Sequence, residues 1–444
     1  MFFKINSISL VGTLNWLLIL FPLSFVAGNT ILNLNLFTFI ILGLFYLTKI
    51  KINIKYNLLF ISQTLLILFT ITLIFSSYVN NFNIIKSILF LRFPIFIFIC
   101  IYLFKEKSFN LEKIFYYYAI FVSVIVLDLI FQYLLGFNII GLKQIETGPG
   151  DSMYLASTSF FHGEKIAGSF VQNFGFFLVF VIFKIFKKND FKAFFYQSIF
   201  ISLISISIFA SDQRMSLFIW VFFLLIYGLF YFKTKLLPIL FSIILLNLFI
   251  FNFSSEDSII RYSSFIDNAK TIGIDSAKNL NLINDKEKFN EVEGDKEKRL
   301  DYVKGSGHAT LYANALYIWQ ENKIIGTGYK NFYIKCAEKK LLRCATHPHN
   351  YYLDILVSTG IVGFFIIFLF VFLLFFKTIN FLLIYINNKN FNKIDALSIV
   401  FINFLMFFFP LKSSGSFFTT SNSTYMIVVL AMLLSLLQKK NSKI

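Results

Sequence analysis

The chain of 444 residues is 57% hydrophobic and only 14% charged, with a mean hydropathy of +0.74. Soluble domains carry about 25% charged residues, so this composition excludes a soluble globular protein. Long apolar runs satisfy their own backbone in lipid only as helices, which predicts an all-α polytopic membrane protein. The net charge of +17 would favour nucleic-acid binding in a soluble protein, but here the placement of lysines around membrane spans explains it better.

Twelve apolar segments are expected to cross the membrane. They are residues 8–27, 30–48, 58–79, 87–104, 114–136, 167–186, 194–210, 216–232, 237–253, 351–376, 396–411 and 424–438. The first could instead be a signal peptide that ends near Phe25-Val-Ala27, although an uncleaved first span fits the charge distribution.

The lysines predict the orientation of these spans. If the N-terminus lies inside, the cytoplasmic segments and their flanks hold nineteen lysines, whereas the short outer segments hold five basic residues. The nineteen are Lys4, Lys49, Lys51, Lys55, Lys105, Lys107, Lys113, Lys184, Lys187, Lys188, Lys192, Lys233, Lys235, Lys377, Lys389, Lys393, Lys439, Lys440 and Lys443; the five are Lys86, Lys143, Lys165, Arg214 and Lys412. The positive-inside rule then places both termini in the cytoplasm.

Two outer segments are long, residues 137–166 and residues 254–350. The second separates spans 1–9 (residues 1–253) from spans 10–12 (residues 351–444) and is the one sizeable soluble part, a large loop expected outside the cytoplasm. Its mixed-charge run at 285–299 is expected to be a solvated loop or helix face. Apolar residues at helical spacing predict an amphipathic helix over 309–321, which Gly326-Thr-Gly328 follows.

The same loop contains Cys336 and Cys344, with seven residues between them. Outside the cytoplasm a disulfide between them is plausible and would fix the segment before His347. Two free thiols are the alternative. Cys100 falls within the fourth span and is expected to be a buried small residue.

Two of the four histidines lie in His347-Pro-His349-Asn350, at the outer end of the tenth span. A metal site would need further ligands, and Asp354 is the only carboxylate nearby. A general base fits better, because the positive end of the helix dipole disfavours imidazolium and keeps the imidazole neutral near pH 7. Asn350 could orient a phosphate or sugar oxygen, and the pair could also be incidental loop residues.

Two arginines are candidates for binding an anion on the same side. Arg214 lies in the short outer turn between spans 7 and 8, and its guanidinium matches the geometry of phosphate oxygens. Alternatively, it could form a salt bridge with Asp212. Arg92 lies inside the fourth span, where a charge is a functional candidate by default, although it could simply extend toward the outer surface.

Further polar residues are predicted on this side. Glu164 and His162 precede the sixth span, and His308 opens the amphipathic helix. Asp128 and Gln132, one turn apart in the fifth span, are expected to point into the bundle. The sequence contains no glycine-rich nucleotide loop, so a cytoplasmic nucleotide sugar is not the expected donor.

At these residues the chain resembles the O-antigen ligase and polymerase superfamily of bacterial envelope glycosyltransferases. The match is carried by His349-Asn350 with Gly360 and Gly363 at the family spacing, and by the stretches 160–168, 211–217, 310–319 and 325–332. The likeness covers about residues 90–375.

The resemblance implies a twelve-span fold in the bacterial inner membrane, with a large periplasmic loop between spans 9 and 10. It also implies a glycan transfer from undecaprenyl diphosphate to an acceptor hydroxyl, with no metal or other cofactor. It implies that His349 acts as the base and Arg214 binds the diphosphate. Family ligases place a further arginine where this chain has His308. Either His308 contacts phosphate, or Arg261, Arg299 or Lys330 replaces that arginine.

The expected function is therefore a ligase-type transfer of glycan to lipid A-core at the periplasmic face. A polymerase that joins repeat units is the nearest alternative, and a transporter of lipid-linked sugars is a third. A transporter is disfavoured because the polar candidates gather at one surface rather than at the midplane.

Overall fold

The computed structural model describes residues 7–52, 58–106, 109–147, 154–186, 190–231, 235–284, 307–341, 343–387, 391–412 and 415–441. This part of the chain is almost entirely helical, and its two strands pair as one antiparallel hairpin. The elements are α1 (Ser7–Ile19), α2 (Phe21–Val26), α3 (Asn29–Leu47), α4 (Leu58–Val79), α5 (Ile84–Ile88), η1 (Leu89–Leu91), α6 (Arg92–Leu103), α7 (Leu111–Leu135), β1 (Ile145–Thr147), β2 (Tyr154–Ala156), α8 (Ala167–Ile185), α9 (Phe191–Ala210), α10 (Arg214–Phe230), α11 (Leu236–Phe253), α12 (Glu256–Asn284), α15 (Gly307–Glu321), α16 (Phe332–Glu338), α17 (Tyr351–Asn387), α18 (Phe391–Phe407) and α19 (Thr420–Asn441).

The structure confirms an all-α polytopic membrane protein. Within the described residues, nine helices are long and apolar enough to cross a membrane. Three shorter apolar helices, within α1, α10 and α18, coincide with the remaining predicted segments. Each of the twelve apolar segments therefore contains helix. In lipid, the backbone N–H and C=O groups of an apolar segment have no water to bond, and a helix pairs them within the segment.

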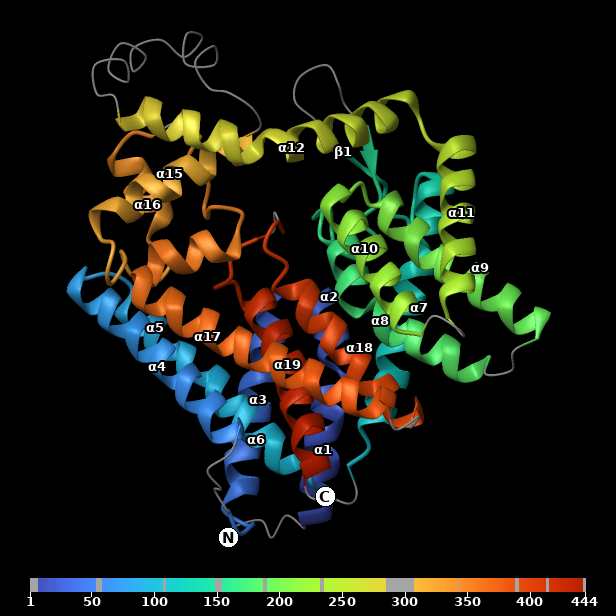
Figure 1. Cartoon of the computed structure of the whole chain (residues 1–444), viewed down its shortest axis with the longest axis horizontal. Coiled ribbons are helices and arrows are strands. Elements are labelled where there is room, and N and C mark those ends of the chain that lie inside the picture. Colours follow the sequence, from blue (N-terminus) through green and yellow to red (C-terminus); the bar gives the residue numbers. More distant parts are fainter. Residues whose placement is uncertain are drawn as a thin grey trace.

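Helices α8 and α19 form the interior of the bundle. Most of their side chains are buried, whereas most side chains of α4 and α11 are not. Figure 1 shows α19 in the middle of the assembly, with α1 starting and α19 ending at the end opposite α12. Phenylalanine fills much of this core, as in the edge-to-face pair of Phe21 and Phe96 at 5.7 Å.

Helix α12 crosses the opposite end of the bundle, from α11 to α15 and α16 (Figure 1). Together α12, α15, α16 and α17 enclose a second hydrophobic cluster, which contains Ile283, Leu311, Ile318, Phe332 and Val357. The helix expected over 309–321 is present as α15. The 29-residue α12 was not predicted, and the mixed-charge run at 285–299 lies outside the described residues.

The tenth predicted span is not one continuous helix. Gly360 has φ 64° and ψ −165°, which breaks α17 into two helical parts. The prediction of an uninterrupted span over 351–376 is wrong in this respect, and α17 also continues to Asn387. The left-handed φ favours glycine, and a Cβ at position 360 would lie 2.2 Å from the carbonyl oxygen of Ile324.

The backbone groups freed by this break are paired with residues 323–328. The N–H groups of Thr327 and Gly328 donate to the carbonyl oxygens of Val357 and Ser358 at 2.7 and 3.0 Å. In return, the N–H groups of Ile361 and Val362 donate to Lys323 and Ile324 at 2.9 and 3.3 Å. The loop segment is thereby hydrogen-bonded into a membrane helix, since unpaired backbone groups there are strongly unfavourable.

Candidate functional site

Three of the four histidines come together at the start of α17. The His349 ring lies 4.1 Å from the His347 ring and 5.3 Å from the His308 ring, measured between centroids. His308 comes from the first turn of α15, whereas His347 and His349 belong to the loop that precedes α17. Residues about forty positions apart in the chain therefore share one site.

The three imidazoles are neutral at physiological pH. Burial, with smaller contributions from the rings of His347 and His308, lowers the pKa of His349 to about 3. Burial and the charge of Lys330 lower the pKa of His347 to about 4. Burial and the charge of Arg214 lower the pKa of His308. Both causes disfavour the cationic form of an imidazole, so each ring is available to accept a proton.

The backbone holds His349 in a left-handed conformation, with φ 57°. Its N–H donates to Nδ1 of His347 at 3.2 Å. Nδ1 of His347 is therefore unprotonated, and the neutral ring carries its proton on Nε2. Non-glycine residues adopt this conformation at a cost, which is common at functional sites.

Asn350 caps the following helix. Its Oδ1 accepts from the N–H groups of Tyr352 and Leu353 at 3.0 and 3.2 Å, the pattern of a helix N-cap. Its Nδ2 donates to the carbonyl oxygen of Pro410 at 2.9 Å. These contacts fix the start of α17, and with it the position of His349.

Arg214 opens α10 and faces α12. Its Nη1 donates to the carbonyl oxygen of Arg261 at 3.1 Å, and its guanidinium lies 5.9 Å from the Phe265 ring. Asp212 pairs with Arg261 at 3.2 Å rather than with Arg214. No carboxylate among the described residues forms an ion pair with Arg214, so its charge is available to an anion on the side of His308.

The segment before α8 packs on this arginine turn. The hydroxyl of Ser169 donates to Oε1 of Gln213 at 2.6 Å, and a Cβ at Gly168 would lie 2.0 Å from Oγ of Ser211. Glu164 and His162 lie just before this contact, and both side chains are exposed. Among the described residues, no contact joins Glu164 or His162 to the three clustered histidines.

Asp128 and Gln132 are buried, as their spacing predicted. Oδ2 of Asp128 accepts from the hydroxyl of Ser159 at 2.6 Å, and Oε1 of Gln132 accepts from the N–H groups of Thr158 and Ser159 at 2.8 and 2.7 Å. They anchor the segments around Asn138 and Ser159 to α7.

Arg92 and Lys330 are two further basic residues to place relative to the histidines. Arg92 begins α6 after the 3-10 turn η1, donates to Oδ1 of Asn33 at 3.2 Å, and lies 4.7 Å from the Phe93 ring. Lys330 extends from the loop after Gly328 with φ 55°. Its charge acts on His347, and the charges of Arg92 and Lys86 act on Lys330.

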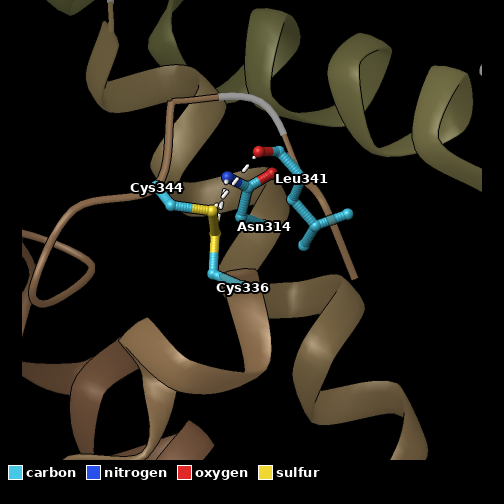
Figure 2. The surroundings of a disulfide bond; sticks show 4 residues. All are labelled: Asn314, Cys336, Leu341 and Cys344. Carbon is cyan, nitrogen blue, oxygen red and sulfur yellow. Dashed lines mark hydrogen bonds between the residues drawn. A yellow bond between two sulfur atoms is a disulfide. The ribbon is translucent and has the colours of Figure 1, made fainter. Parts of the chain in front are cut away.

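A disulfide joins Cys336 and Cys344, with their Cα atoms 5.7 Å apart (Figure 2). Cys336 belongs to α16 and is fully buried beside Asn314 of α15, whose Nδ2 lies 3.7 Å from the sulfur. The bond ties the segment that leads to His347 onto the second hydrophobic cluster.

Arg343 lies inside this constrained loop, and the sequence analysis did not single it out. A Cβ at Gly307 would lie 3.3 Å from Nη1 of Arg343, so the guanidinium lies beside the residue that precedes His308. Arg299, one of the three expected replacements for the family arginine, is outside the described residues, whereas Arg261 pairs with Asp212 and the charge of Lys330 acts on His347. No sequence signal marks Arg343, because its proximity to His308 depends on the fold of the loop.

A comparison with family models matches residues 199–368 to the family described as O-Antigen ligase. The matched range contains the arginine turn, α12, all three clustered histidines and the Gly360 break, whereas Arg92 and Glu164 lie before it. A search of curated proteins finds no match. The O-antigen ligase match at residues 199–368 supports the resemblance of this chain to the O-antigen ligase and polymerase superfamily.

Proposed function

We propose that the protein is a glycosyltransferase that moves a glycan from undecaprenyl diphosphate to an acceptor hydroxyl, with His349 as general base. The observation that carries this proposal is the position of His349, a neutral imidazole whose ring lies beside those of His347 and His308, with the charge of Arg214 acting on His308. A base next to a fixed cation is the pair of groups that such a transfer requires.

In the proposed step, the acceptor oxygen forms a bond to the anomeric carbon of the donor while its proton passes to His349. The bond between that carbon and the diphosphate oxygen breaks, and its electron pair leaves with the diphosphate. Arg214 and Arg343 bind the diphosphate and stabilise its growing negative charge. General-base catalysis contributes about 10²–10⁴-fold.

Donor binding also strengthens the base. The pKa of about 3 keeps His349 neutral but makes it a weak proton acceptor. A diphosphate held nearby favours the imidazolium form and raises that pKa toward its ordinary value. The base therefore becomes effective when the donor is bound, which limits the activation of water in its absence.

The membrane orientation belongs to the same proposal. The lysine distribution supports cytoplasmic termini and a site on the periplasmic face of the bacterial inner membrane, where lipid-linked donors and lipid A-core would both be accessible. Asn350 supports catalysis by holding His349, and metal ions have no assigned part. Between ligase and polymerase, the ligase-type spacing of His349, Gly360 and Gly363 favours the ligase.

Two experiments test this proposal. If the protein is a ligase, a deletion strain should lose polymer from lipid A-core and retain it on the undecaprenyl carrier. If it is a polymerase, the lipopolysaccharide of the deletion strain should carry a single repeat unit. Normal lipopolysaccharide banding contradicts both. With purified protein in detergent, transfer from undecaprenyl-diphosphate-linked glycan should continue in EDTA, and its loss would contradict metal independence.

A further inference from the structure

The two sulfur atoms of the disulfide lie in different surroundings. Cys336 belongs to α16 and is fully buried in the second hydrophobic cluster. Cys344 lies in the loop that follows α16 and is only half-buried. A thiolate that opens a disulfide must reach the sulfur it attacks, so the difference in exposure favours attack at Cys344.

The polar groups beside the two sulfurs differ in the same direction (Figure 2). Nδ2 of Asn314, a fully buried side chain, donates to the sulfur of Cys336 at 3.7 Å. The sulfur of Cys344 instead lies 3.3 Å from the carbonyl oxygen of Leu341. An N–H donor stabilises a departing thiolate and offsets part of the cost of its burial, whereas a carbonyl oxygen disfavours a thiolate. Cys336 is therefore the sulfur that leaves.

Opening the bond affects a segment that two other anchors delimit. Leu341 is buried, and its N–H donates to the carbonyl oxygen of Cys336 at 3.1 Å. At the other end, Nδ2 of Asn350 donates to the carbonyl oxygen of Pro410 at 2.9 Å. The disulfide fixes Cys344 between these anchors, and its loss gives residues 342–349 more conformational freedom.

Arg343 lies in this segment and directly precedes Cys344. Its Nη1 lies 3.3 Å from the position of a Cβ on Gly307, the residue before His308. The side chain is exposed, and the backbone is left-handed with φ 52°. A long exposed side chain loses conformational entropy when it is held in one place, so the position of the guanidinium depends on a fixed backbone. The disulfide provides that constraint one residue away.

We propose that Cys344 is a site of thiol–disulfide exchange, and that opening the disulfide weakens binding of the donor diphosphate through Arg343. The second part rests on the proposed function, which assigns Arg343 to the diphosphate. In the exchange, an external thiolate forms a bond to the sulfur of Cys344. The bond to Cys336 breaks, and its electron pair leaves with Cys336, which takes up a proton. A second external thiol then displaces Cys344, so two thiols are oxidised to a disulfide while the two cysteines are reduced.

Mapping of the mixed disulfide tests the site of attack. The protein carries Cys100→Ser, which removes the buried free thiol. It is treated with reduced glutathione, quenched with acid and cleaved with trypsin, which separates the two cysteines. We expect glutathione on Cys344 and none on Cys336. Glutathione on Cys336, or on neither cysteine, would overturn the exchange site.

Two matched variants test the difference in exposure directly. In the C100S background, Cys336→Ala leaves only the half-buried thiol and Cys344→Ala leaves only the buried one. The first variant should react with an aromatic disulfide reagent about tenfold or more faster than the second, because reactivity follows access and thiolate character. Equal rates would overturn the assignment of Cys344 as the attacked sulfur.

The donor KM tests the second part. Reduction with dithiothreitol should raise KM for the undecaprenyl-diphosphate-linked donor by about 3- to 10-fold, because a contact to a charged group is loosened rather than removed. The C336A/C344A variant should match the reduced protein and respond no further to dithiothreitol. Arg343→Gln should raise KM by about tenfold or more and should not respond to reduction. Lys340→Gln, an exposed lysine in the same loop, should respond as the wild type does.

The outcomes separate the two parts. A donor KM that does not change on reduction, or that changes equally in R343Q and the wild type, would overturn the coupling through Arg343. An oxidised wild-type protein that transfers no glycan would refute the proposed function and that coupling with it. The glutathione adduct is measured without substrate, so it decides the exchange site in either case.

Discussion

The backbone N–H of His349 donates to Nδ1 of His347 across 3.2 Å, so the second histidine positions the first. This contact separates their roles. His349 presents an imidazole to the site, whereas His347 fixes the backbone that carries it.

Replacement of His349 by asparagine should reduce glycan transfer by about 100-fold or more, because it removes the base. Asparagine tolerates the left-handed backbone at this position better than alanine does, so the protein should still fold and insert. The control is His162→Asn, which changes an exposed histidine with φ 47° outside the cluster. Transfer rates near the wild-type value in H349N would remove the base role.

His347→Asn and His347→Ala should differ. The amide oxygen of asparagine can accept the hydrogen bond from His349 in place of Nδ1, whereas alanine cannot. We expect H347A to lower kcat by about 3- to 10-fold, the equivalent of one hydrogen bond, and H347N to retain most of the activity. Equal losses in the two variants would show that the imidazole itself, rather than the hydrogen bond, is needed.

The ion pair of Asp212 and Arg261 should stabilise the contact of α12 with the arginine turn. Both side chains are largely buried, with 7% and 16% of their surface exposed. Asp212→Asn and Arg261→Gln should each lower Tm, and the double variant should lose less than the sum of the two. The expected coupling energy is about 1 kcal/mol or more. Strictly additive losses would indicate that the pair contributes nothing to stability.

Gly360→Ala should prevent assembly of the site. A Cβ at this position would overlap the carbonyl of Ile324, and the left-handed φ adds strain. We expect the free energy of unfolding to fall by about 3 kcal/mol or more, as in severe overpacking. The control is Gly273→Ala in α12, where no atom lies within 4 Å of the added Cβ. That variant should be slightly stabilised, by up to about 1 kcal/mol. A G360A protein that is monodisperse and transfers glycan normally would show that glycine is not required at position 360.

Stability should decrease as the pH falls below about 6.5, the ordinary pKa of histidine. The pKa values of His347 and His349 are lowered to about 4 and 3, and that of His308 is lowered too. Between these values and 6.5 the unfolded chain binds protons that the folded chain does not, so acid favours unfolding. Measurements of Tm from pH 7.5 to 4.5 should show a shallower slope in the H308Q/H347N/H349N variant than in H162N. Equal slopes would mean that other groups cause the acid sensitivity.

The apolar segments could be predicted from composition because a membrane span depends on a local run of residues. The helix α15 could be predicted because its apolar residues recur at helical spacing. Helix α12 was missed because its buried face includes Ser276 and Asn279, whereas Ile259 and Ile266 are exposed. The hydrophobic pattern therefore does not mark the face that packs.

The broken α17 and the position of Arg343 have a different cause. The apolar run around Gly360 is uninterrupted, and the break depends on hydrogen bonds from a loop thirty residues earlier. The side chain of Arg343 lies beside Gly307 only because the intervening loop folds back. Likewise, Asp212 and Arg261 are 49 residues apart, and the sequence favoured the nearer Arg214 as the partner of Asp212. Local patterns predict elements, and these contacts depend on how the elements meet.

The reciprocal backbone hydrogen bonds between residues 323–328 and the two parts of α17 determine the order in which these segments can fold during synthesis. A ribosome makes the Gly326-Thr-Gly328 segment before it makes Val357, Ser358, Ile361 and Val362, the residues with which that region pairs. The hydroxyl of Ser76, from the third apolar segment, also donates to Ser358 at 2.9 Å. The loop can therefore reach its final structure only after the tenth segment has entered the membrane next to the third. A nascent chain that stalls before that point carries Arg214 and His308 but no assembled site, so the enzyme cannot act on its lipid-linked substrate while it is still being inserted.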